Sequence, residues 1–380
     1  MKDLKQIMPK KLGFGCMRLP VANGNSEEID DVVFSRMIDR YMEQGFVYFD
    51  TAYPYHNQKS EEAVRRCLVA RYDRERFLLA DKMPVWLVQN TEDYSEIFER
   101  QLARCGVTYF DFYLLHAMNK TRVEETEKTG GFAFVQRMKT EGRIRHIGFS
   151  FHDTAEALEE ILKNHPEMEF VQLQINYYDW ESENVQSRKC YEVAKKYGVP
   201  VIVMEPVKGG TLANMVGEPA RILSALDENA SYASYAVRYA ASLPNVILVL
   251  SGMSDLKQLQ DNTAYMKDFQ PLTDKEQQAI GKVVEELEKL PTIPCTNCRY
   301  CVEGCPKKIR IPDIFGVYNM GVQFGLTDVT RGSYRCQIDG SGKAGDCIKC
   351  GKCEAQCPQH LEIRKLLEEA ADIYEKEMHL

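Results

Sequence analysis

The residues with the clearest capacity for chemistry are cysteines near the end of this 380-residue chain. Nine of the thirteen cysteines lie after residue 290. Eight of these nine repeat the spacing Cys-x2-Cys-x2-Cys-x3-Cys-Pro, first over 295–306 and again over 347–358. Deprotonated thiols are strong ligands for soft metal centres. The repeat therefore predicts metal ligation by two groups of cysteines.

The surroundings of these cysteines argue for free thiolates rather than disulfides. Residues 1–11 are basic and run directly into Leu12 without the apolar stretch of a secretory signal, so we expect a cytoplasmic protein. Disulfides are rare in that reducing setting. The sequence has no run of about 18 apolar residues that would cross a membrane, and its net charge of −8 argues against nucleic acid as a partner.

The cysteine repeat resembles bacterial ferredoxins with two [4Fe-4S] clusters, over about residues 291–360. In that pattern the fourth cysteine of each run crosses to the other cluster. The resemblance implies one cluster on Cys295, Cys298, Cys301 and Cys357, and a second on Cys347, Cys350, Cys353 and Cys305. A pair of zinc sites is the alternative, but zinc usually pairs Cys-x2-Cys units across a longer gap. The exact repetition ending in Cys-Pro favours iron–sulfur clusters.

The two cysteine runs are separated by a long spacer, residues 306–346. This is longer than a compact ferredoxin needs, so we interpret it as an insertion that could contact the barrel or a partner. Cys336 lies inside the spacer, and we expect it to be a free buried thiol.

A second candidate set follows three consecutive strand-like runs and consists of Asp50, Tyr55, Lys82 and His116. Each alone has an ordinary structural explanation, such as a turn cap or a satisfied core histidine. Together they could deliver a proton to an oxygen while a hydride reaches carbon. A phenol titrates near pH 10, and we expect the Lys82 ammonium, oriented by Asp50, to lower the pKa of Tyr55. His116 could then polarise a substrate carbonyl.

The elements that must position this set alternate between strands and helices. Strand-like apolar runs recur at 12–16, 46–52, 77–80, 110–115, 144–149, 170–175, 199–204 and 246–250. Helical patterns lie between them at 27–44, 60–71, 93–105, 154–164 and 184–197. Eight strands over about 260 residues predict a (β/α)₈ TIM barrel. An open doubly wound sheet is the alternative, but its G-x-G-x-x-G fingerprint is absent after the first run.

A domain boundary follows the barrel. Residues 273–290 have the apolar spacing of an amphipathic helix that begins at Thr273, and Pro291 and Pro294 prevent its continuation. We therefore predict a barrel over 1–272, a helical linker over 273–290 and a ferredoxin-like iron–sulfur domain over 291–380.

Several segments of the predicted barrel resemble the aldo-keto reductase family, in consistent order over about residues 10–265. These are Gly13-Phe-Gly-Cys-Met-Arg18, Phe49-Asp-Thr-Ala-Tyr-Pro-Tyr55, the Lys82 and Leu114-Leu-His116 strand ends, Ile147-Gly-Phe-Ser150 and Ser251-Gly-Met-Ser254 with Gln258 to Asn262. The resemblance implies carbonyl reduction by NADP(H) or NAD(H), with Tyr55 as general acid. It also implies a set of cofactor contacts: Gly15, Met17, Arg18, Ser150, Gln174, Met204, Lys208, Gly209, Gly210, Gly252, Ser254, Gln258 and Asn262.

Two positions depart from the family pattern. Phe151 stands where the family usually has an asparagine, and Met204 stands where an aromatic side chain usually stacks on the nicotinamide. A thioether packs against a ring but does not stack as another ring would. The choice between NADP and NAD therefore stays open.

Joining the two domains leaves three hypotheses, because nicotinamide passes two electrons as hydride and each cluster passes one. In the first, the clusters relay electrons between an external donor or acceptor protein and a small carbonyl substrate in the barrel. In the second, an ordinary nicotinamide-dependent reductase carries purely structural clusters. In the third, the barrel is non-catalytic and serves an electron-carrier or redox-sensing module. A flavin could connect the two kinds of electron transfer, although no sequence feature identifies one.

Overall fold

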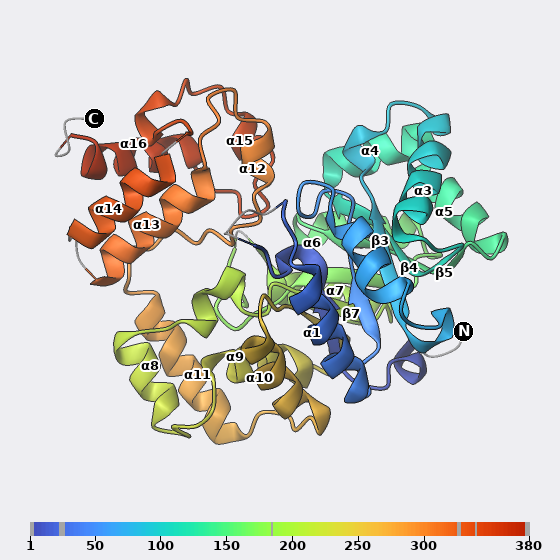
Figure 1. The fold of residues 1–380 in the computed structure, drawn as a ribbon, viewed down its shortest axis with the longest axis horizontal. Helices are drawn as coiled ribbons and strands as arrows, with labels where there is room; N and C mark the ends of the chain where they lie inside the picture. The colour runs from blue at the N-terminus through green and yellow to red at the C-terminus, as the bar shows by residue number, and fades with distance from the viewer. Residues whose placement is uncertain (1–3, 23–26, 184, 325–327, 339, 377–380) are drawn as a thin grey trace. The chain divides into compact units, whose positions relative to one another are not determined.

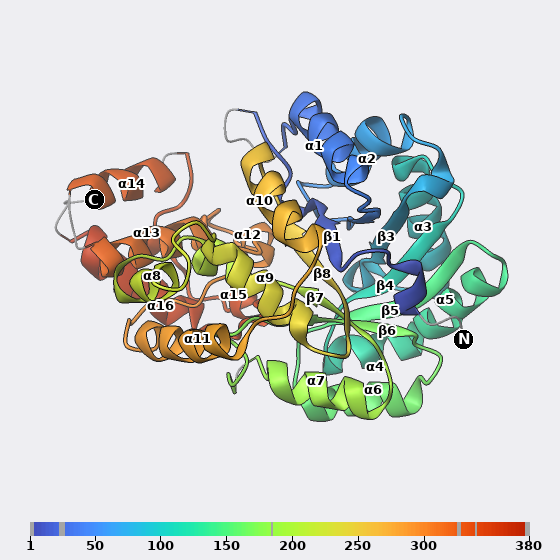
Figure 2. The same ribbon diagram turned by 90° about the horizontal axis from the view of Figure 1, so that it is seen from below.

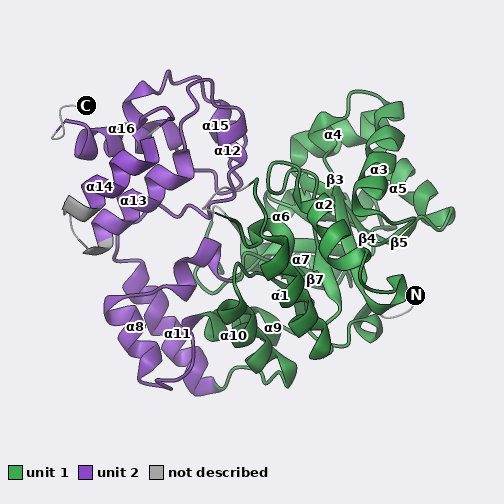
Figure 3. Ribbon diagram, viewed as in Figure 1, with its two compact units in different colours: residues 1–206, 233–273 green, residues 207–232, 274–380 purple. Residues whose placement is uncertain are grey.

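The computed structural model describes residues 4–22, 27–183, 185–324, 328–338 and 340–376. The chain forms two compact units, Met1–Pro206 with Ala233–Thr273, and Val207–Tyr232 with Asp274–Leu380 (Figure 3). Among the described residues, no helix is both long enough and apolar enough to cross a membrane.

The first unit contains a closed barrel of parallel strands in sequence order, β1 to β8. In the described part of the chain the strands are β1(Leu12–Gly15), β2(Tyr48–Asp50), β3(Leu78–Met83), β4(Phe110–Met118), β5(Ile144–Phe151), β6(Phe170–Gln174), β7(Val201–Met204) and β8(Val246–Gly252). Each of them overlaps one predicted strand-like run. The predicted (β/α)₈ barrel is confirmed, and the open-sheet alternative is wrong.

Helices surround these strands (Figures 1 and 2). They are α1(Asp31–Glu43), α2(Ser60–Val64), α3(Thr91–Cys105), α4(Lys120–Thr129), α5(Gly131–Thr140), α6(Ala155–Asn164), α7(Ser187–Lys196), α9(Tyr232–Ser242) and α10(Leu256–Lys267). Short turns are η1(Leu4–Ile7), η2(Cys16–Arg18), the π-helical η3(Arg65–Val69), η4(Arg74–Arg76) and η5(Val85–Leu87). All five predicted helical patterns correspond to helices, although the pattern 184–197 begins at a residue outside those described.

The barrel interior shows which way each strand faces. One apolar cluster draws on six strands, with Tyr48, Ala80, Phe112, Leu114, Phe170, Ile202, Leu248 and Leu250 among its members. The strand positions of this cluster are even-numbered except for Ile247 of β8, which lies at a register shift between β7 and β8. Successive side chains of a strand point to opposite faces. Even positions of these strands therefore point into the barrel. Phe112 packs edge-on against Tyr48 and Phe170, with ring centroids 5.2 and 5.3 Å apart, so the interior is a packed core.

The same alternation continues to the carboxyl ends of the strands. Asp50, Lys82 and His116 follow the core residues Tyr48, Ala80 and Leu114 by two positions each. Ser150, Gln174, Met204 and Gly252 occupy the equivalent even positions near the ends of β5 to β8. The strand periodicity thus directs these predicted site residues toward the mouth of the barrel.

The second unit contains a helical domain with its own core. Its elements are η6(Lys208–Ala213), α8(Gly217–Ser224), α11(Asp274–Leu287), α12(Tyr300–Glu303), α13(Ile311–Phe324), α14(Asp328–Ile338), η7(Ala344–Asp346), α15(Lys352–Ala355) and α16(Ile363–Tyr374). Helices α8 and α11 pack together. Tyr334 of α14 stacks on Tyr374 of α16 with ring centroids 4.9 Å apart, and the Tyr374 hydroxyl donates to the carbonyl oxygen of Val317 at 3.0 Å. The spacer 306–346 therefore contributes helices to this core.

The expectation that Cys336 is buried is wrong, since its side chain is exposed. Helix α14 turns its buried side chain Tyr334 toward the core. A residue two positions further along a helix points about 200° away from it. Cys336 consequently lies on the solvent side of α14.

Candidate functional site

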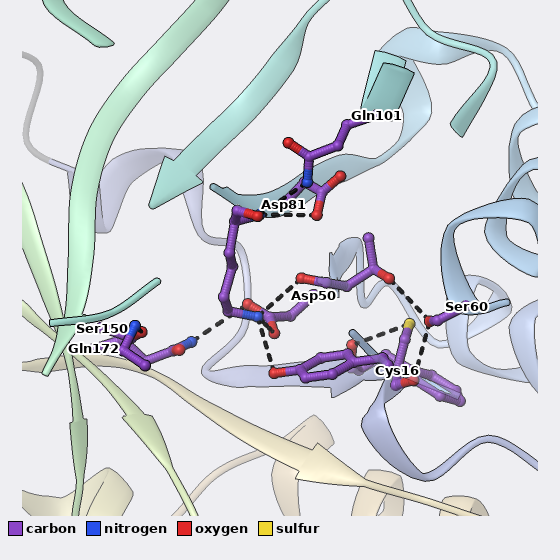
Figure 4. Close-up of polar contacts among 12 residues, drawn as sticks. Cys16, Asp50, Ser60, Asp81, Gln101, Ser150 and Gln172 are labelled. Carbon is purple, nitrogen blue, oxygen red and sulfur yellow. Dashed lines mark hydrogen bonds and ion pairs between the residues drawn. The ribbon is translucent and has the colours of Figure 1, made fainter. Parts of the chain in front are cut away.

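The four-residue set predicted from the strand ends contains a buried hydrogen-bonded core. Lys82 Nζ donates to Asp50 Oδ1 at 2.5 Å, to the Thr51 carbonyl oxygen at 2.8 Å and to the Tyr55 hydroxyl at 3.2 Å. The second oxygen of Asp50 accepts a hydrogen bond of 3.3 Å from Gln172 Nε2 (Figure 4). Lys82 is fully buried and Asp50 is 2% exposed. The ammonium is thus held in one position, next to the phenol, by fixed partners.

The turn that carries Tyr55 has an unusual backbone. The three residues after it, His56, Asn57 and Gln58, all have positive φ angles of 51°, 52° and 65°. Such left-handed conformations are unfavourable for residues with a side chain and persist only where the surroundings enforce them. His56 is fixed because its Nε2 accepts a hydrogen bond from the Leu19 amide at 2.9 Å. This turn holds Tyr55 between β2 and α2.

His116 completes the set from β4. Its ring lies 6.2 Å from the Tyr55 ring at an angle of 84°, and 5.1 Å from the Trp86 ring, measured between centroids. Burial lowers the pKa of His116 well below its ordinary value, and the positive charges of Lys82 and Arg122 lower it further. The imidazole is therefore neutral at physiological pH, with one ring N–H that can donate.

The electrostatics of Tyr55 differ from the sequence expectation. We expected Lys82 to lower the pKa of the phenol, but this pKa is raised well above its ordinary value. Burial is the largest cause, followed by the negative charges of Asp50 and Glu205. Loss of hydration disfavours the phenolate more than the neighbouring ammonium favours it. Tyr55 therefore retains its proton, as a proton donor must before it reacts.

A second network, not predicted from the sequence, holds the main chain of β3 around Lys82 (Figure 4). Asp81 Oδ1 accepts from the Lys82 amide at 2.8 Å, and Gln101 Nε2 of α3 donates to the Lys82 carbonyl oxygen at 2.9 Å. Gln101 also donates to Glu61 at 3.2 Å, and Arg104 donates to Glu61 at 3.1 Å. Burial raises the pKa of Glu61 to about 7 and that of Asp81 well above its ordinary value. The sequence feature that could have indicated this network is Asp81, an aspartate on the outward face of an apolar strand.

Most of the predicted cofactor contacts belong to the barrel unit, and several lie together. Gly15 and Gly252 are register partners across β1 and β8, and a Cβ atom on Gly252 would lie 3.2 Å from the Arg18 side chain. Ser254 Oγ donates to the Arg18 carbonyl oxygen at 2.9 Å, and the Ser254 amide donates to Gln258 Oε1 at 2.8 Å. Met17 lies on η2 beside Arg18. The ends of β1 and β8 and the start of α10 therefore lie close together.

Other predicted contacts have partners inside the protein. Ser150 Oγ accepts from the Ala117 amide at 2.7 Å, and Gln174 Nε2 donates to Asp179 at 2.8 Å. Asn262 is 5% exposed; its amide nitrogen donates to Ser251 Oγ at 2.7 Å, and its oxygen accepts from the Tyr265 hydroxyl at 2.6 Å. The side chain of Asn262 is therefore occupied by contacts within the barrel.

These barrel residues are compatible with a nicotinamide dinucleotide. The paired glycines Gly15 and Gly252 leave two neighbouring strand ends without side chains. The hydroxyl of Ser150 and the amide of Gln174 lie at the ends of β5 and β6 and have the hydrogen-bonding chemistry that a carboxamide needs. The other three predicted contacts, Lys208, Gly209 and Gly210, belong to the second unit.

The eight repeat cysteines surround two cavities in the second unit. One cavity, which is partly open to solvent, is lined by Cys295, Cys298, Cys301 and Cys357. The other, also partly open to solvent, is lined by Cys305, Cys347, Cys350 and Cys353. Each cavity thus receives three cysteines from one run and the fourth from the other run, as the ferredoxin resemblance implies.

The chemistry of the cavity walls fits iron–sulfur clusters. Apart from the thiols the walls are largely apolar, and Ile311 lines both cavities. Within the described ranges, no three His, Cys, Asp or Glu side chains are grouped closely enough to hold a single metal ion. Four thiols spread around one cavity match a cluster, in which each thiolate binds a different iron atom.

The two cysteine runs are also a structural repeat. Left-handed backbone occurs at three pairs of equivalent positions: Asn297 and Lys349, Arg299 and Gly351, and Lys308 and His360. The short helices α12 and α15 begin at the same distance after the first cysteine of each run. Equal spacing in the sequence therefore corresponds to equal backbone turns around each cavity.

Comparison with known families assigns both units. The aldo/keto reductase family matches residues 11–285, which is more than half of the chain. The chain belongs to the aldo/keto reductase family. A 4Fe-4S dicluster domain matches residues 294–362 of this reductase. The protein is thus an oxidoreductase of aldo/keto reductase type with a C-terminal 4Fe-4S domain.

Individual relatives resemble mainly the reductase part. An uncharacterized oxidoreductase of Schizosaccharomyces pombe is 25% identical over 266 residues, which cover 67% of this chain and 81% of the relative. A 9,11-endoperoxide prostaglandin H2 reductase of Trypanosoma cruzi is 25% identical over 250 residues, covering 64% and 80%.

Solved structures show the same fold. The holo form of an aldo-keto reductase from Bacillus halodurans has a TM-score of 0.57 and 26% identity, over 72% of this chain and 91% of that one. An aldo-keto reductase from Klebsiella pneumoniae in complex with NADPH has a TM-score of 0.56 and 19% identity, over 72% and 90%.

Proposed function

We propose that this reductase converts a small carbonyl compound to an alcohol, with Tyr55 as the proton donor. The observation that carries the proposal is the buried hydrogen-bonded set of Lys82, Asp50 and Tyr55. A bound nicotinamide dinucleotide would supply the hydride that reaches the carbonyl carbon. We infer NADP(H) as the first cofactor to test, since a solved relative of the same fold is in complex with NADPH.

The residues of the chain then supply the proton and the orientation. Tyr55 gives its proton to the carbonyl oxygen, so the oxygen becomes a hydroxyl and the phenol becomes a phenolate. Lys82, whose Nζ donates to the Tyr55 oxygen at 3.2 Å, stabilises that phenolate, and Asp50 keeps the ammonium in place. The neutral imidazole of His116 donates a hydrogen bond to the carbonyl oxygen and polarises it. Burial of these groups excludes competing water.

We propose two [4Fe-4S] clusters, one held by Cys295, Cys298, Cys301 and Cys357 and one by Cys305, Cys347, Cys350 and Cys353. The grouping of these cysteines around two separate cavities supports this arrangement.

We further propose that the clusters exchange electrons one at a time with an external carrier protein. The edge of the second site supports this role because Cys350 is exposed and Ile348 is 57% exposed. Exposed Lys307 and Lys352 line the same cavity, so this edge is basic and suits an acidic carrier.

Purely structural clusters are the second candidate, and one observation favours them. Cys301 and Cys353 belong to the buried core of the second unit, and Cys295, Cys305, Cys347 and Cys357 are partly buried against it. Clusters bound there would complete this core whether or not they carry electrons. A barrel without catalysis is disfavoured because its proton-donor set is complete and buried.

The catalytic proposal is tested by replacing Tyr55 with Phe. We expect Tyr55→Phe to reduce kcat/KM for NADPH-dependent carbonyl reduction by about 10²–10⁴-fold, the usual contribution of a general acid. Iron content should not change. Tyr53→Phe is the matched control, because it removes a phenol hydroxyl two residues away. Equal activity of Tyr55→Phe and Tyr53→Phe would exclude Tyr55 as the proton donor.

The role of the clusters is tested on anaerobically purified protein. Iron and sulfide analysis should give two [4Fe-4S] clusters per chain. If the clusters carry electrons, a chemically reduced acidic carrier should bleach their absorbance at about 400 nm. If the clusters are intact but neither a carrier nor a nicotinamide bleaches them, electron transfer is excluded and the structural role is retained.

A further inference from the structure

Strand β3 continues beyond the end of its neighbour β2, and Lys82 lies in the part that extends. The last register pair of these strands joins Asp50 to Ala80, and the Ala80 carbonyl oxygen accepts from the Thr51 amide at 3.0 Å. In a parallel sheet, every second residue directs its main-chain groups to the same neighbouring strand. The amide and carbonyl of Lys82 therefore face the side on which β2 has ended. Lys82 is fully buried, so both groups need partners within the protein.

Two side chains replace the missing strand (Figure 4). Asp81 Oδ1 accepts from the Lys82 amide at 2.8 Å, and Gln101 Nε2 donates to the Lys82 carbonyl oxygen at 2.9 Å. Both side chains are fully buried. Asp81 belongs to β3 itself, whereas Gln101 comes from α3 and so ties the strand to a second element. Without the Gln101 amide, the Lys82 carbonyl would lose a buried hydrogen bond that water could not easily replace.

The amide group of Gln101 is held in one orientation by its other partners. Its Oε1 accepts from the Tyr113 hydroxyl of β4 at 2.5 Å, and its Nε2 also donates to Glu61 Oε1 of α2 at 3.2 Å. Burial raises the pKa of Tyr113 well above its ordinary value, so the phenol keeps the proton that it donates. A flipped amide would turn Oε1 toward the Lys82 carbonyl, which can only accept. Tyr113 and Glu61 therefore keep the Gln101 donor aimed at Lys82.

We propose that Gln101 is a positioning residue for carbonyl reduction, which holds the main chain of Lys82 so that its ammonium stays beside Tyr55. Asp50 and the Thr51 carbonyl fix the ammonium end of the lysine side chain, and Gln101 fixes the end attached to the strand. Lys82 Nζ is 3.2 Å from the Tyr55 oxygen, and its stabilisation of a phenolate there weakens as this distance grows. The inference rests on the proposed function, because it assumes that Tyr55 gives up its proton.

The kinetic test compares Gln101→Met with Leu102→Ala. The first variant keeps the length of the side chain but removes its donor. The second truncates the next residue of α3, which is 3% exposed, and so weakens the packing of the same helix. We expect Gln101→Met to lower kcat for NADPH-dependent carbonyl reduction by about tenfold and to leave KM for the carbonyl compound within about twofold. Leu102→Ala should keep both constants near the wild-type values. An unchanged kcat in Gln101→Met, or equal losses in both variants, would overturn the proposed role.

A milder variant covers the case in which Gln101→Met does not fold. Tyr113→Phe removes the hydrogen bond that orients the Gln101 amide but leaves the amide in place. We expect it to lower kcat by about threefold without a change in KM, as loss of one hydrogen bond commonly allows. A wild-type kcat in Tyr113→Phe would contradict the orientation of Gln101 as the source of the effect.

The route through Lys82 is tested in a double variant. In the background of Lys82→Met the ammonium that Gln101 positions is absent, so adding Gln101→Met should lower kcat by less than about twofold. Leu102→Ala should have the same small effect in both backgrounds. If Gln101→Met costs about tenfold with and without Lys82, it acts by another route and the proposal is wrong.

A crystal structure of full-length Gln101→Met separates the inference from the proposed function, because it needs no activity. We expect the distance from Lys82 Nζ to the Tyr55 oxygen to exceed its present 3.2 Å. Unchanged hydrogen bonds of Lys82 with Tyr55 and Asp50 would overturn the positioning role, whether or not the wild type reduces carbonyls. Carbonyl reduction that survives Tyr55→Phe contradicts the proposed function. A reductase that depends on Tyr55 but is unaffected by Gln101→Met contradicts the inference alone.

Discussion

The two groups of reactive side chains in this protein are positioned in different ways. In the barrel, Lys82, Asp50 and Tyr55 are joined by direct hydrogen bonds, and strand periodicity aims Lys82 and Asp50 at the mouth. In the second unit, eight cysteines stand around two cavities without closing on a single point. The first site is preformed by the protein. The second is a shell whose centre we expect metal clusters to fill, so the two sites should respond differently to metal removal and to mutation.

The largest difference should follow removal of iron with a chelator and an oxidant. Metal binding to such a shell contributes to folding, so residues 291–380 should become readily cleaved in limited proteolysis. The barrel should remain folded. Both tryptophans, Trp86 and Trp180, belong to the barrel unit, and their fluorescence reports on it alone. A proteolysis pattern unchanged by iron removal would show that the second unit, like the barrel, is preformed.

In the barrel, the largest loss of stability should follow disruption of the ion pair between Lys82 and Asp50. Lys82→Met leaves the Asp50 carboxylate buried without its ammonium, which should lower the free energy of unfolding by about 3–5 kcal/mol. The double variant Lys82→Met/Asp50→Asn should recover most of that loss. Urea unfolding followed by tryptophan fluorescence measures both.

The surface pair of Lys163, which is exposed, and Glu159, whose side chain is 25% exposed, provides the control. Lys163→Met should change stability by less than about 1 kcal/mol, as exposed ion pairs do. If the double variant is no more stable than Lys82→Met, the buried charge is not the cause of the loss.

A smaller effect should come from Glu61, whose pKa is raised from its ordinary value near 4.5 to about 7. Between these values the folded state binds a proton that the unfolded state has released. The contribution of Glu61 to the stability of the wild type should therefore fall as pH rises from about 4.5 to about 7. Glu61→Gln has no such proton, so its stability relative to wild type should increase over this window by up to about 3 kcal/mol.

Urea unfolding at several pH values measures that change. Asp81, Gln101 and Arg104 surround Glu61, so Glu62→Gln on the more exposed side of α2 is a suitable control. A stability difference that is constant with pH would mean that Glu61 titrates normally in the folded protein.

The smallest effect should come from Cys336, the described cysteine after residue 290 that lines neither cavity. Cys336→Ser should change stability by less than about 0.5 kcal/mol, as exposed substitutions usually do, and iron content should stay at the wild-type value. In the native protein, iodoacetamide should label Cys336 first, as mass spectrometry can show. Loss of iron in Cys336→Ser would show that helix α14 also contributes to cluster binding.

The parts of the fold that follow simple periodicity could be predicted from the sequence. The eight strand-like runs are apolar because the barrel strands are buried on both faces. Helix α4 was missed because it is strongly polar and buries one residue, Thr126, so it has no apolar stripe. It is separated from α5 by Gly130, whose φ is 83°.

Some features of the candidate sites could be predicted from the sequence, and others could not. The positions of Asp50, Lys82 and His116 follow from strand ends, but the raised pKa of Tyr55 depends on burial by residues far away in the sequence. The network of Asp81, Glu61 and Gln101 joins three elements and has no spacing rule. A Cβ atom on Gly209 would lie 2.5 Å from the carbonyl oxygen of Thr296, and this tight approach also could not be read from the sequence, because a Gly-Gly pair equally suits a plain turn.

The alternation of inward side chains has a consequence for how this barrel can change over evolutionary time. On β4, Phe112, Leu114 and His116 face inward because they are separated by two residues. Deleting one residue between Phe112 and His116 would turn the histidine outward and bring an apolar neighbour into its place. Deleting two residues would shorten the row of inward-facing side chains on β4 but would leave His116 facing inward. Loops at the mouth can lengthen freely, whereas strand lengths before the reactive residues can change only in steps of two.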